Sequence, residues 1–295
     1  SICRVLESKG FNAKNKNLIT TSRQDLDLEN EKQVESWFKV NKPNIVIIAA
    51  AQVGGIMSNK TMPVKFLLKN LKIQNNLIEK SYEYGVKNLL FLGSSCIYPK
   101  LCKQPIKEEY LLESSLEDTN QWYAIAKIAG IKLCEAYKKQ FNFNSISLMP
   151  PNLYGPKDNY NLENCHVMPA LIRKFHEAKI NKQKTVLVWG TGIPRREFLH
   201  VSDLAKAIIY MLEHYSSSNP INIGTGQDIS IKEFAEIIAD VVGYDGKITF
   251  DETKPDGTPL KKLDISKALS YGWKPEISLK SGIKSTYNWA LKNIF

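Results

Sequence analysis

Three side chains in this sequence have the chemical types and the spacing that move a proton on and off a carbinol oxygen. Ser94 follows an apolar run, and Tyr123 is followed four residues later by Lys127. A spacing of four residues places Tyr123 and Lys127 on one face of a helix, where the ammonium can lower the pKa of the phenol from about 10 toward the working pH. The Ser94 hydroxyl can hold the same substrate oxygen. This set therefore predicts general acid–base catalysis coupled to hydride transfer.

The segment before Ser94 strengthens this prediction. A Tyr-x-x-x-Lys pair is by itself a weak signal, because such pairs occur by chance in many helices. Residues 87–92, however, have the pattern of a buried strand of a parallel sheet, and they run directly into Gly93 and Ser94. Ligands of open α/β sheets bind beyond the carboxyl ends of the strands, which is where Ser94 would lie.

The first half of the sequence alternates predicted strands and helices. The expected helices cover residues 1–9, 29–40 and 64–84 and the segment around Tyr123, and the expected strands cover residues 17–21, 44–50, 87–92 and 145–148. Such alternation predicts an α/β fold with a doubly wound, Rossmann-like parallel sheet.

Beyond residue 156 the pattern loosens, which predicts a smaller C-terminal α+β lobe that binds the substrate. We expect helices at residues 168–178, 231–242 and 280–293 and strands at residues 185–189 and 247–250. The nucleotide-binding domain is predicted to comprise residues 1–156 plus about 197–222, and the substrate lobe residues 157–196 and 223–295.

The glycine-rich turn of a dinucleotide-binding fold is absent from the sequence. Such a fold opens with a strand and a Gly-rich turn against which the pyrophosphate rests. The only glycine in the first fifty residues is Gly10, which follows the first predicted helix. We therefore expect a sheet that lacks its first strand, and a truncated, non-catalytic relative of an enzyme stays open as a hypothesis.

The composition favours a globular enzyme over a membrane or secreted protein. Hydrophobic residues make up 43% and charged residues 24% of the chain, as in ordinary soluble enzymes. No apolar run approaches the ~18 residues of a membrane span, and no signal peptide is recognisable. The five cysteines are odd in number and lack the paired spacing of metal sites. We expect a cytoplasmic protein without a metal site and without a membrane partner.

The formal net charge of +10 raises the hypothesis of a nucleic-acid partner. The lysines are scattered, however, with no block of five or six and no basic stretch interleaved with aromatic residues. We therefore expect no nucleic-acid partner and a lysine-rich solvated surface. The alternative is an electrostatic funnel for a substrate that carries phosphate.

Several motifs, in order along the chain, resemble the GDP-L-fucose synthase family of extended short-chain dehydrogenases/reductases. They cover residues 49–56, 91–100, 123–130, 152–156, 166–170, 196–201 and 254–259. Members of this family epimerise and reduce GDP-4-keto-6-deoxy-D-mannose to GDP-L-fucose. The resemblance implies NADP(H) as cofactor, a GDP-sugar as substrate and a homodimer as the assembly.

The resemblance also implies the catalytic roles. Ser94, Tyr123 and Lys127 would form the reductase triad, and Cys96 and His166 the acid/base pair that epimerises the sugar at the two carbons beside the ketone. Inverting such a carbon requires one group to remove the proton and another to return it from the opposite face. The residues alone leave Cys96 open as a small buried side chain and His166 as a structural one. A redox-neutral, NAD-dependent nucleotide-sugar epimerase or dehydratase is the alternative, although a 4-epimerase has no need of this pair.

Arg23 follows the predicted strand of residues 17–21, which is the second strand of such a fold when the missing first one is counted. An arginine at this place favours the 2′-phosphate of NADP, and an acidic residue would favour NAD. The other cofactor contacts that the resemblance implies are Asp27, Leu28, Ala50, Gly93, Ser94, Lys127, Asn152, Leu153 and His166.

The nucleotide-sugar contacts that the resemblance implies are Lys174, Trp189, Arg196, Asp256 and Lys261. Arg196 and Lys261 can neutralise a diphosphate. Trp189 can pack on a base or a sugar, with packing in the core as the alternative.

Overall fold

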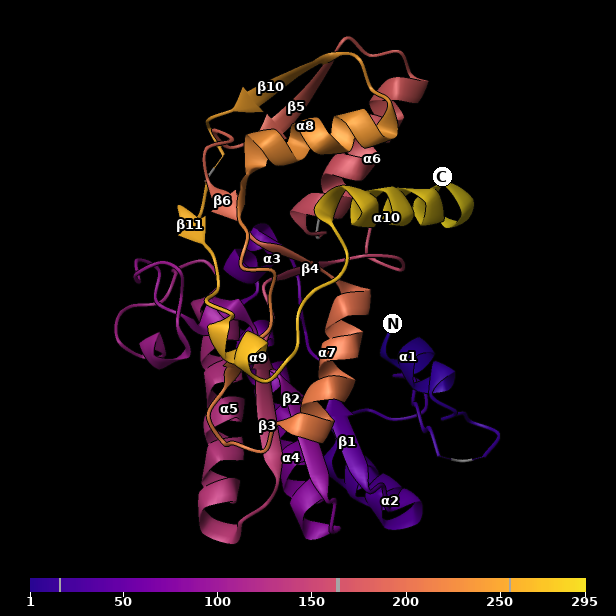
Figure 1. Ribbon diagram of the computed structural model, residues 1–295, viewed down its shortest axis with the longest axis vertical. Helices are drawn as coiled ribbons and strands as arrows, with labels where there is room; N and C mark the ends of the chain where they lie inside the picture. The colour runs from indigo at the N-terminus through magenta and orange to yellow at the C-terminus, as the bar shows by residue number, and fades with distance from the viewer. Residues whose placement is uncertain (16, 163–164, 255) are drawn as a thin grey trace.

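The computed structural model describes residues 1–15, 17–162, 165–254 and 256–295. Figure 1 shows two parts stacked along the long axis of the molecule, with the parallel sheet in the lower part. The strands of this sheet, in spatial order, are β1 (Ile45–Ile48), β2 (Asn88–Leu92), β3 (Ser145–Met149) and β8 (Ile221–Asn222). All three neighbouring pairs are parallel, which confirms the predicted α/β fold.

Helices cover both faces of the sheet, because successive residues of a strand point to opposite sides. Leu89 and Phe91 of β2 lie in one core and Leu90 in another. The first core is shared with α2 (Glu31–Asn41), α4 (Pro63–Glu83) and α5 (Gln121–Phe141). The second core is shared with α1 (Ile2–Ser8) and α7 (Val201–His214).

Strand β1 lies at an edge of the sheet, and the prediction of a strand at residues 17–21 is wrong. In the described part of the chain, β1 pairs with β2 alone, and Ile45 is half exposed. Residues 17–21 form no strand. Their sequence favours an extended backbone, but a strand also requires a neighbour that pairs with its N–H and C=O groups.

The upper part has its own core. Here β5 (Thr185–Trp189) pairs in parallel with β10 (Lys247–Asp251). The helices around this pair are α6 (Val167–Ile180), α8 (Ile231–Val242) and α10 (Leu279–Asn293). Their apolar faces meet at Phe175, Phe234 and Ile283. The prediction of helices and strands in this region is confirmed within a few residues at each end.

The remaining elements are short. They are β4 (Asn152–Tyr154), β6 (Arg195–Arg196), β7 (Phe198–His200), β9 (Ile229–Ser230) and β11 (Leu260–Lys261), with the helices α3 (Ile56–Thr61), α9 (Ser266–Ser270), η1 (Ser95–Ile97) and η2 (Glu108–Tyr110). Strand β4 pairs with β7, and β6 lies between β11 and β9. Leu263 and Trp273, late in the sequence, pack into the cores of the lower part.

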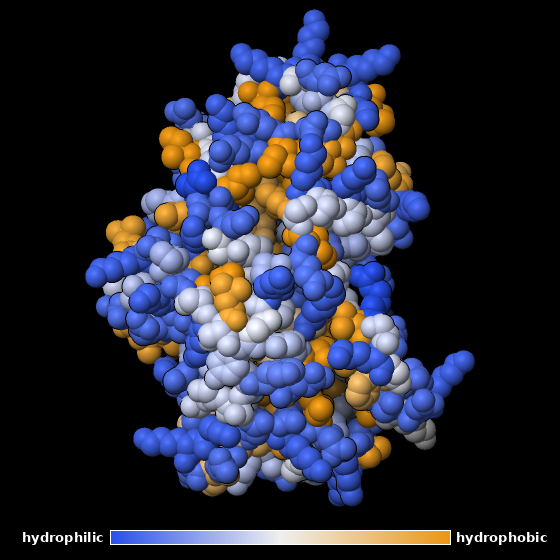
Figure 2. Space-filling view, viewed as in Figure 1, coloured by the Kyte–Doolittle hydropathy of each residue, from blue (hydrophilic) through white to orange (hydrophobic). Residues whose placement is uncertain are grey.

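Hydrophilic residues cover most of the face seen in Figure 2, and apolar residues appear on it in small separate groups. None of the helices in the described ranges is long and apolar enough to cross a membrane.

Candidate active site

Ser94 stands at the carboxyl end of β2, where the strand turns into the short helix η1. Gly93 precedes it and packs so closely that a Cβ atom there would lie 2.4 Å from the Met149 sulfur. The Ser94 Oγ accepts a hydrogen bond from the Cys96 backbone N–H at 3.2 Å. This bond caps η1 and keeps the Ser94 hydroxyl next to Cys96.

Helix α5 brings Tyr123 and Lys127 to the same strand end. Gly130 allows the close approach of this helix, because a Cβ atom there would lie 2.6 Å from the Phe91 ring. Lys127 is 3% exposed, and its Nζ donates to the Leu92 carbonyl at 2.8 Å. The same Nζ lies 5.9 Å from the centre of the Tyr123 ring. Ser94 lies close enough to the Tyr123 phenol to lower its pKa through a hydrogen bond, so the three side chains lie around the carboxyl end of β2.

The electrostatics of this site differ from the expectation. Burial raises the pKa of Tyr123, the nearby Cys96 adds to this effect, and the hydrogen bond with Ser94 opposes it. Burial lowers the pKa of Lys127 to about 8. The expected lowering of the phenol pKa by Lys127 is therefore wrong for this structure, since removal from water penalises the phenolate and the ammonium donates to a carbonyl. At neutral pH the phenol keeps its proton, as a proton donor must.

Cys96 lies at the Ser94 site, whereas His166 lies near Asp158. The Cys96 side chain is half-buried, and its Sγ accepts a hydrogen bond from Lys261 Nζ at 3.7 Å. His166 is the residue before α6, and its side chain is exposed to solvent. His166 lies close enough to Asp158 to influence its carboxylate. Burial raises the pKa of Asp158, and the nearby His166 lowers it in part. Within the described residues, no hydrogen bond joins His166 to Cys96, and their roles stay predictions.

The residues predicted to bind the nucleotide-sugar lie on α6, β5, β6 and β11 and in the segment before β11. Trp189 ends β5 and is 53% exposed, which excludes packing in the core. The Nζ atoms of Lys174 and Lys254 lie 5.2 and 5.6 Å from its ring centre. An exposed indole between two ammonium groups suits an anionic, planar ligand.

Asp256 lies against Gly190, the residue after Trp189, and contacts Arg196. The Asp256 carboxylate accepts from the Thr191 backbone N–H and hydroxyl, both at 2.8 Å. The Arg196 guanidinium donates to the backbone carbonyls of Arg195 and Asp256 at 2.8 and 3.1 Å. Pro255, in the motif of residues 254–259, lies outside the described residues.

The other residues predicted to bind the cofactor come from several segments of the chain. Arg23 is well exposed, and its guanidinium lies 3.3 Å from Glu29, which also pairs with Lys69 at 2.7 Å. Asp27 accepts from the Glu29 backbone N–H, and the Leu28 side chain packs against the core. The remaining residues are Ala50, exposed after β1, and Asn152 and Leu153 on β4.

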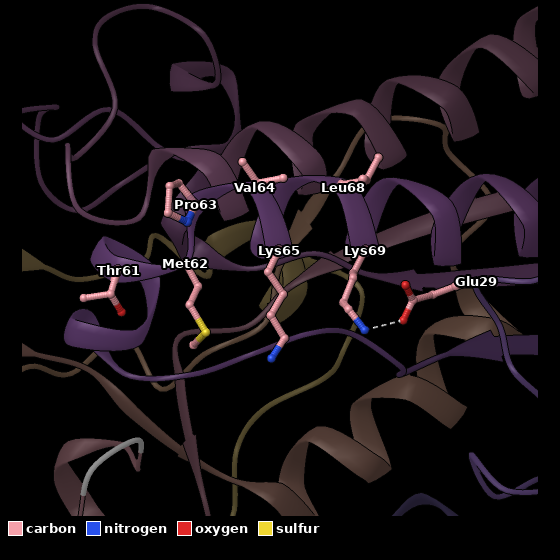
Figure 3. Close-up of a pocket in the computed structure, with 8 residues that line it drawn as sticks. All are labelled: Glu29, Thr61, Met62, Pro63, Val64, Lys65, Leu68 and Lys69. Carbon is pink, nitrogen blue, oxygen red and sulfur yellow. Dashed lines mark hydrogen bonds and ion pairs between the residues drawn. The ribbon is translucent and has the colours of Figure 1, made fainter.

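Figure 3 shows a pocket of about 460 Å³ beside Glu29. Its lining comes mainly from α4, with Lys65 and Lys69 on one side of the helix and Val64 and Leu68 on the other. Ser94, Tyr123 and Cys96 do not line it. This pocket is therefore separate from the Ser94 site.

Glu197 is a buried acid that the sequence analysis missed. It is 1% exposed, and its carboxylate accepts from the backbone N–H groups of Gly226 at 2.8 Å, Leu263 at 2.7 Å and Thr225. Its carbonyl accepts from both nitrogens of Asn152. Glu197, directly before β7, thus ties two loops and β4 together. The available signal was a glutamate directly before the apolar residues of a buried strand.

We expect Glu197→Ala to destabilise the protein by about 2–4 kcal/mol, because three buried backbone N–H groups lose their acceptor. The free energy of unfolding in urea measures this loss. Glu236→Ala, at an exposed position of α8, is the control and should change stability by less than about 0.5 kcal/mol. Equal effects of the two substitutions would contradict the structural role of Glu197.

Comparisons with known proteins agree with this arrangement. Residues 2–224 match the proteins described as the NAD dependent epimerase/dehydratase family. The chain is 55% identical over 294 residues to GDP-L-fucose synthase 1 of Arabidopsis thaliana, covering 100% of this chain and 90% of the relative. It is 48% identical over 302 residues to GDP-L-fucose synthase of Escherichia coli, covering 99% and 93%. A solved structure of a GDP-mannoheptose C4 reductase from Campylobacter jejuni with NADP bound has a TM-score of 0.89 and 40% identity, covering 98% of this chain and 93% of that one.

Proposed function

The chain belongs to the NAD dependent epimerase/dehydratase family, and we propose that it converts GDP-4-keto-6-deoxy-D-mannose to GDP-L-fucose with NADPH. The observation that carries this proposal is the meeting of Ser94, Cys96, Tyr123 and Lys127 at the carboxyl end of β2. It is supported by relatives at 48–55% identity that are GDP-L-fucose synthases.

Epimerisation uses the polar groups around Cys96. The Cys96 thiolate takes the proton from a carbon beside the ketone, so that an S–H bond forms, the C–H bond breaks and its electron pair moves to the ketone oxygen. Tyr123 and Ser94 donate hydrogen bonds to that oxygen. The His166 imidazolium then returns a proton to the opposite face of the carbon, and the ketone re-forms.

Reduction uses the same oxygen. The residues fit NADPH, because Arg23 presents an exposed guanidinium and the Lys127 ammonium lies beside the Tyr123 phenol. NADPH supplies a hydride to the carbonyl carbon when it is bound. Tyr123 gives its proton to the oxygen, which becomes the hydroxyl group of the product. The Lys127 ammonium, whose pKa burial lowers to about 8, returns a proton to the phenolate that is left.

Incubation of the protein with the keto-sugar and NADPH in D₂O tests this function. We expect one NADPH oxidised per sugar and solvent deuterium at both carbons that flank the ketone. Turnover without net NADPH oxidation would indicate the redox-neutral epimerase instead. NADPH oxidation without deuterium in the sugar would indicate a plain reductase.

We also propose that residues 1–156 with about 197–222 bind NADP and that residues 157–196 and 223–295 bind the GDP-sugar. Separate cores in the two parts support this division. A cytoplasmic location is proposed because the five cysteines, all described, are free thiols.

Arg23→Ala is expected to raise the KM for NADPH about tenfold or more and to leave the KM for NADH nearly unchanged, because a charge-assisted contact to the 2′-phosphate is lost. Steady-state kinetics with both cofactors measures this. Lys32→Ala removes an exposed cation from α2 and serves as the control. Equal changes for the two cofactors would contradict recognition of the 2′-phosphate by Arg23.

We propose that the homodimer forms through the outer sides of α4 and α5. These adjacent helices expose Val64 and Leu68 on α4 and Trp122 and Ile125 on α5. The hollow in Figure 3 adjoins the first two. An apolar strip of this kind is typical of a protein interface.

The double substitution Leu68→Glu and Ile125→Glu is expected to convert the dimer to a monomer in light scattering coupled to size-exclusion chromatography. Charges placed inside an apolar interface remain desolvated and unpaired there. Val40→Glu, at an exposed position of α2, is the control. A dimer that survives the double substitution would place the interface elsewhere.

A further inference from the structure

We infer that Lys261 is a positioning residue for Cys96: its ammonium holds the sulfur at the site, where it takes the proton beside the ketone. The resemblance implied instead that Lys261 binds the diphosphate. This inference rests on the proposed function, since it assigns a partner to the base of the epimerisation.

The contact itself joins distant parts of the chain. Lys261 Nζ lies 3.7 Å from Cys96 Sγ, although 165 residues separate the two. Lys261 belongs to β11, which pairs in parallel with β6, and its partner in the register is Arg196. Paired positions of neighbouring strands place their side chains on the same face. The ladder therefore presents two cations toward the Cys96 loop.

The backbone on both sides of Lys261 is fastened to the loop that follows Cys96. The Gln104 side-chain amide donates to the Leu260 carbonyl at 3.1 Å and accepts from the Lys262 N–H at 3.0 Å. The Ile106 N–H donates to the Lys262 carbonyl at 2.7 Å. These bonds clamp β11 against the Cys96 loop, so the position of the ammonium is set by the backbone and not by a flexible side chain alone.

Few carboxylates compete with Cys96 for the two cations. Among the described residues, Lys261 forms no ion pair with a carboxylate, and the hydrogen bonds of the Arg196 guanidinium go to backbone carbonyls. Asp256 and Glu117 are the acids that act on Arg196. The Asp256 carboxylate is engaged by Thr191, and the Glu117 carboxylate by Thr119 and Asn120. A cation near a thiol favours the thiolate, which is the reactive form.

Two further groups face this pair. The Tyr123 phenol approaches Cys96 from α5, and burial keeps it protonated and neutral. The Cys102 thiol faces Lys261 from the same loop, and burial raises its pKa. Of the two thiols, Cys96 is the one whose sulfur lies within hydrogen-bond distance of the ammonium. Arg196 is therefore left to bind the diphosphate, and Lys261 to hold Cys96.

Alkylation by iodoacetamide at pH 7, followed by mass spectrometry of the Cys96 peptide, tests this assignment directly. We expect Lys261→Met and Lys261→Gln to slow alkylation of Cys96 about tenfold or more, because loss of a nearby opposite charge shifts such equilibria by that factor. Lys261→Arg keeps the charge and should restore most of the rate. Lys262→Met is the matched control, since the Lys262 ammonium pairs with Asp228 at 3.6 Å.

In the Lys261 variants, the rate of deuterium incorporation into the keto-sugar should fall in proportion to the alkylation rate of Cys96. The fall should appear as a decrease in kcat with little change in KM. Unchanged alkylation together with a raised KM would overturn the inference and return Lys261 to the diphosphate. Circular dichroism melting checks that each variant is folded. If the wild-type protein exchanges no deuterium, the proposed function fails, and the alkylation rates alone then decide whether Lys261 holds the thiolate.

Discussion

Replacing Tyr123 with phenylalanine is expected to lower kcat for NADPH-dependent reduction by about 10²–10⁴-fold. The phenol is the acid that stands beside both Ser94 and Lys127, and its burial keeps it protonated at neutral pH. Phenylalanine preserves the ring and its packing but removes the proton. Steady-state oxidation of NADPH, followed at 340 nm as an absorbance change, measures the loss.

Combining Tyr123→Phe with Lys127→Ala shows whether the two residues act on the same proton or independently of each other. Because both residues act on one oxygen, their effects on kcat should not add, and the double variant should be little slower than the slower single variant. Tyr271→Phe, which removes a partly exposed phenol from the residue after α9, is the control. A Tyr123→Phe variant with near-normal turnover would reduce the Tyr-x-x-x-Lys pair to helix packing.

Cys96→Ser is expected to slow solvent exchange at the carbons beside the ketone by about 10²–10⁴-fold, while the site of Ser94, Tyr123 and Lys127 stays assembled. A hydroxyl group loses its proton far less readily than a thiol, so serine is a poor base at neutral pH. Deuterium incorporation measured by mass spectrometry, with NADPH oxidation followed in parallel, separates the two reactions.

His166→Ala should block epimerisation as well, because no acid then returns the proton from the opposite face. Unepimerised keto-sugar would be reduced as a side product in both variants. Cys102→Ser, in the same loop as Cys96, is the matched control and should exchange normally. Wild-type exchange in Cys96→Ser and His166→Ala would rule out this acid/base pair and leave Cys96 as a half-buried structural side chain.

Elements whose residues carry a local signal were predictable from the sequence. The helix predicted for residues 231–242 agrees with α8 at both ends, because Ser230 and Glu233 form a capping box and Gly243 adopts a left-handed conformation after the last turn. The strand of residues 185–189 likewise agrees with β5. Ser94, Tyr123 and Lys127 could be placed at one strand end, because a strand followed by a helix brings them there.

Features that depend on distant neighbours were decided by the tertiary structure. Residues 17–21 form no strand, since pairing requires a second strand that local sequence does not supply. The contact between Cys96 and Lys261 spans 165 residues, and no spacing rule reaches that far. The directions of the pKa shifts of Tyr123 and Lys127 follow from burial. The sequence by itself thus determined which groups could do chemistry, whereas folding decided their charges and partners, because desolvation and long-range contacts exist only once the chain is packed.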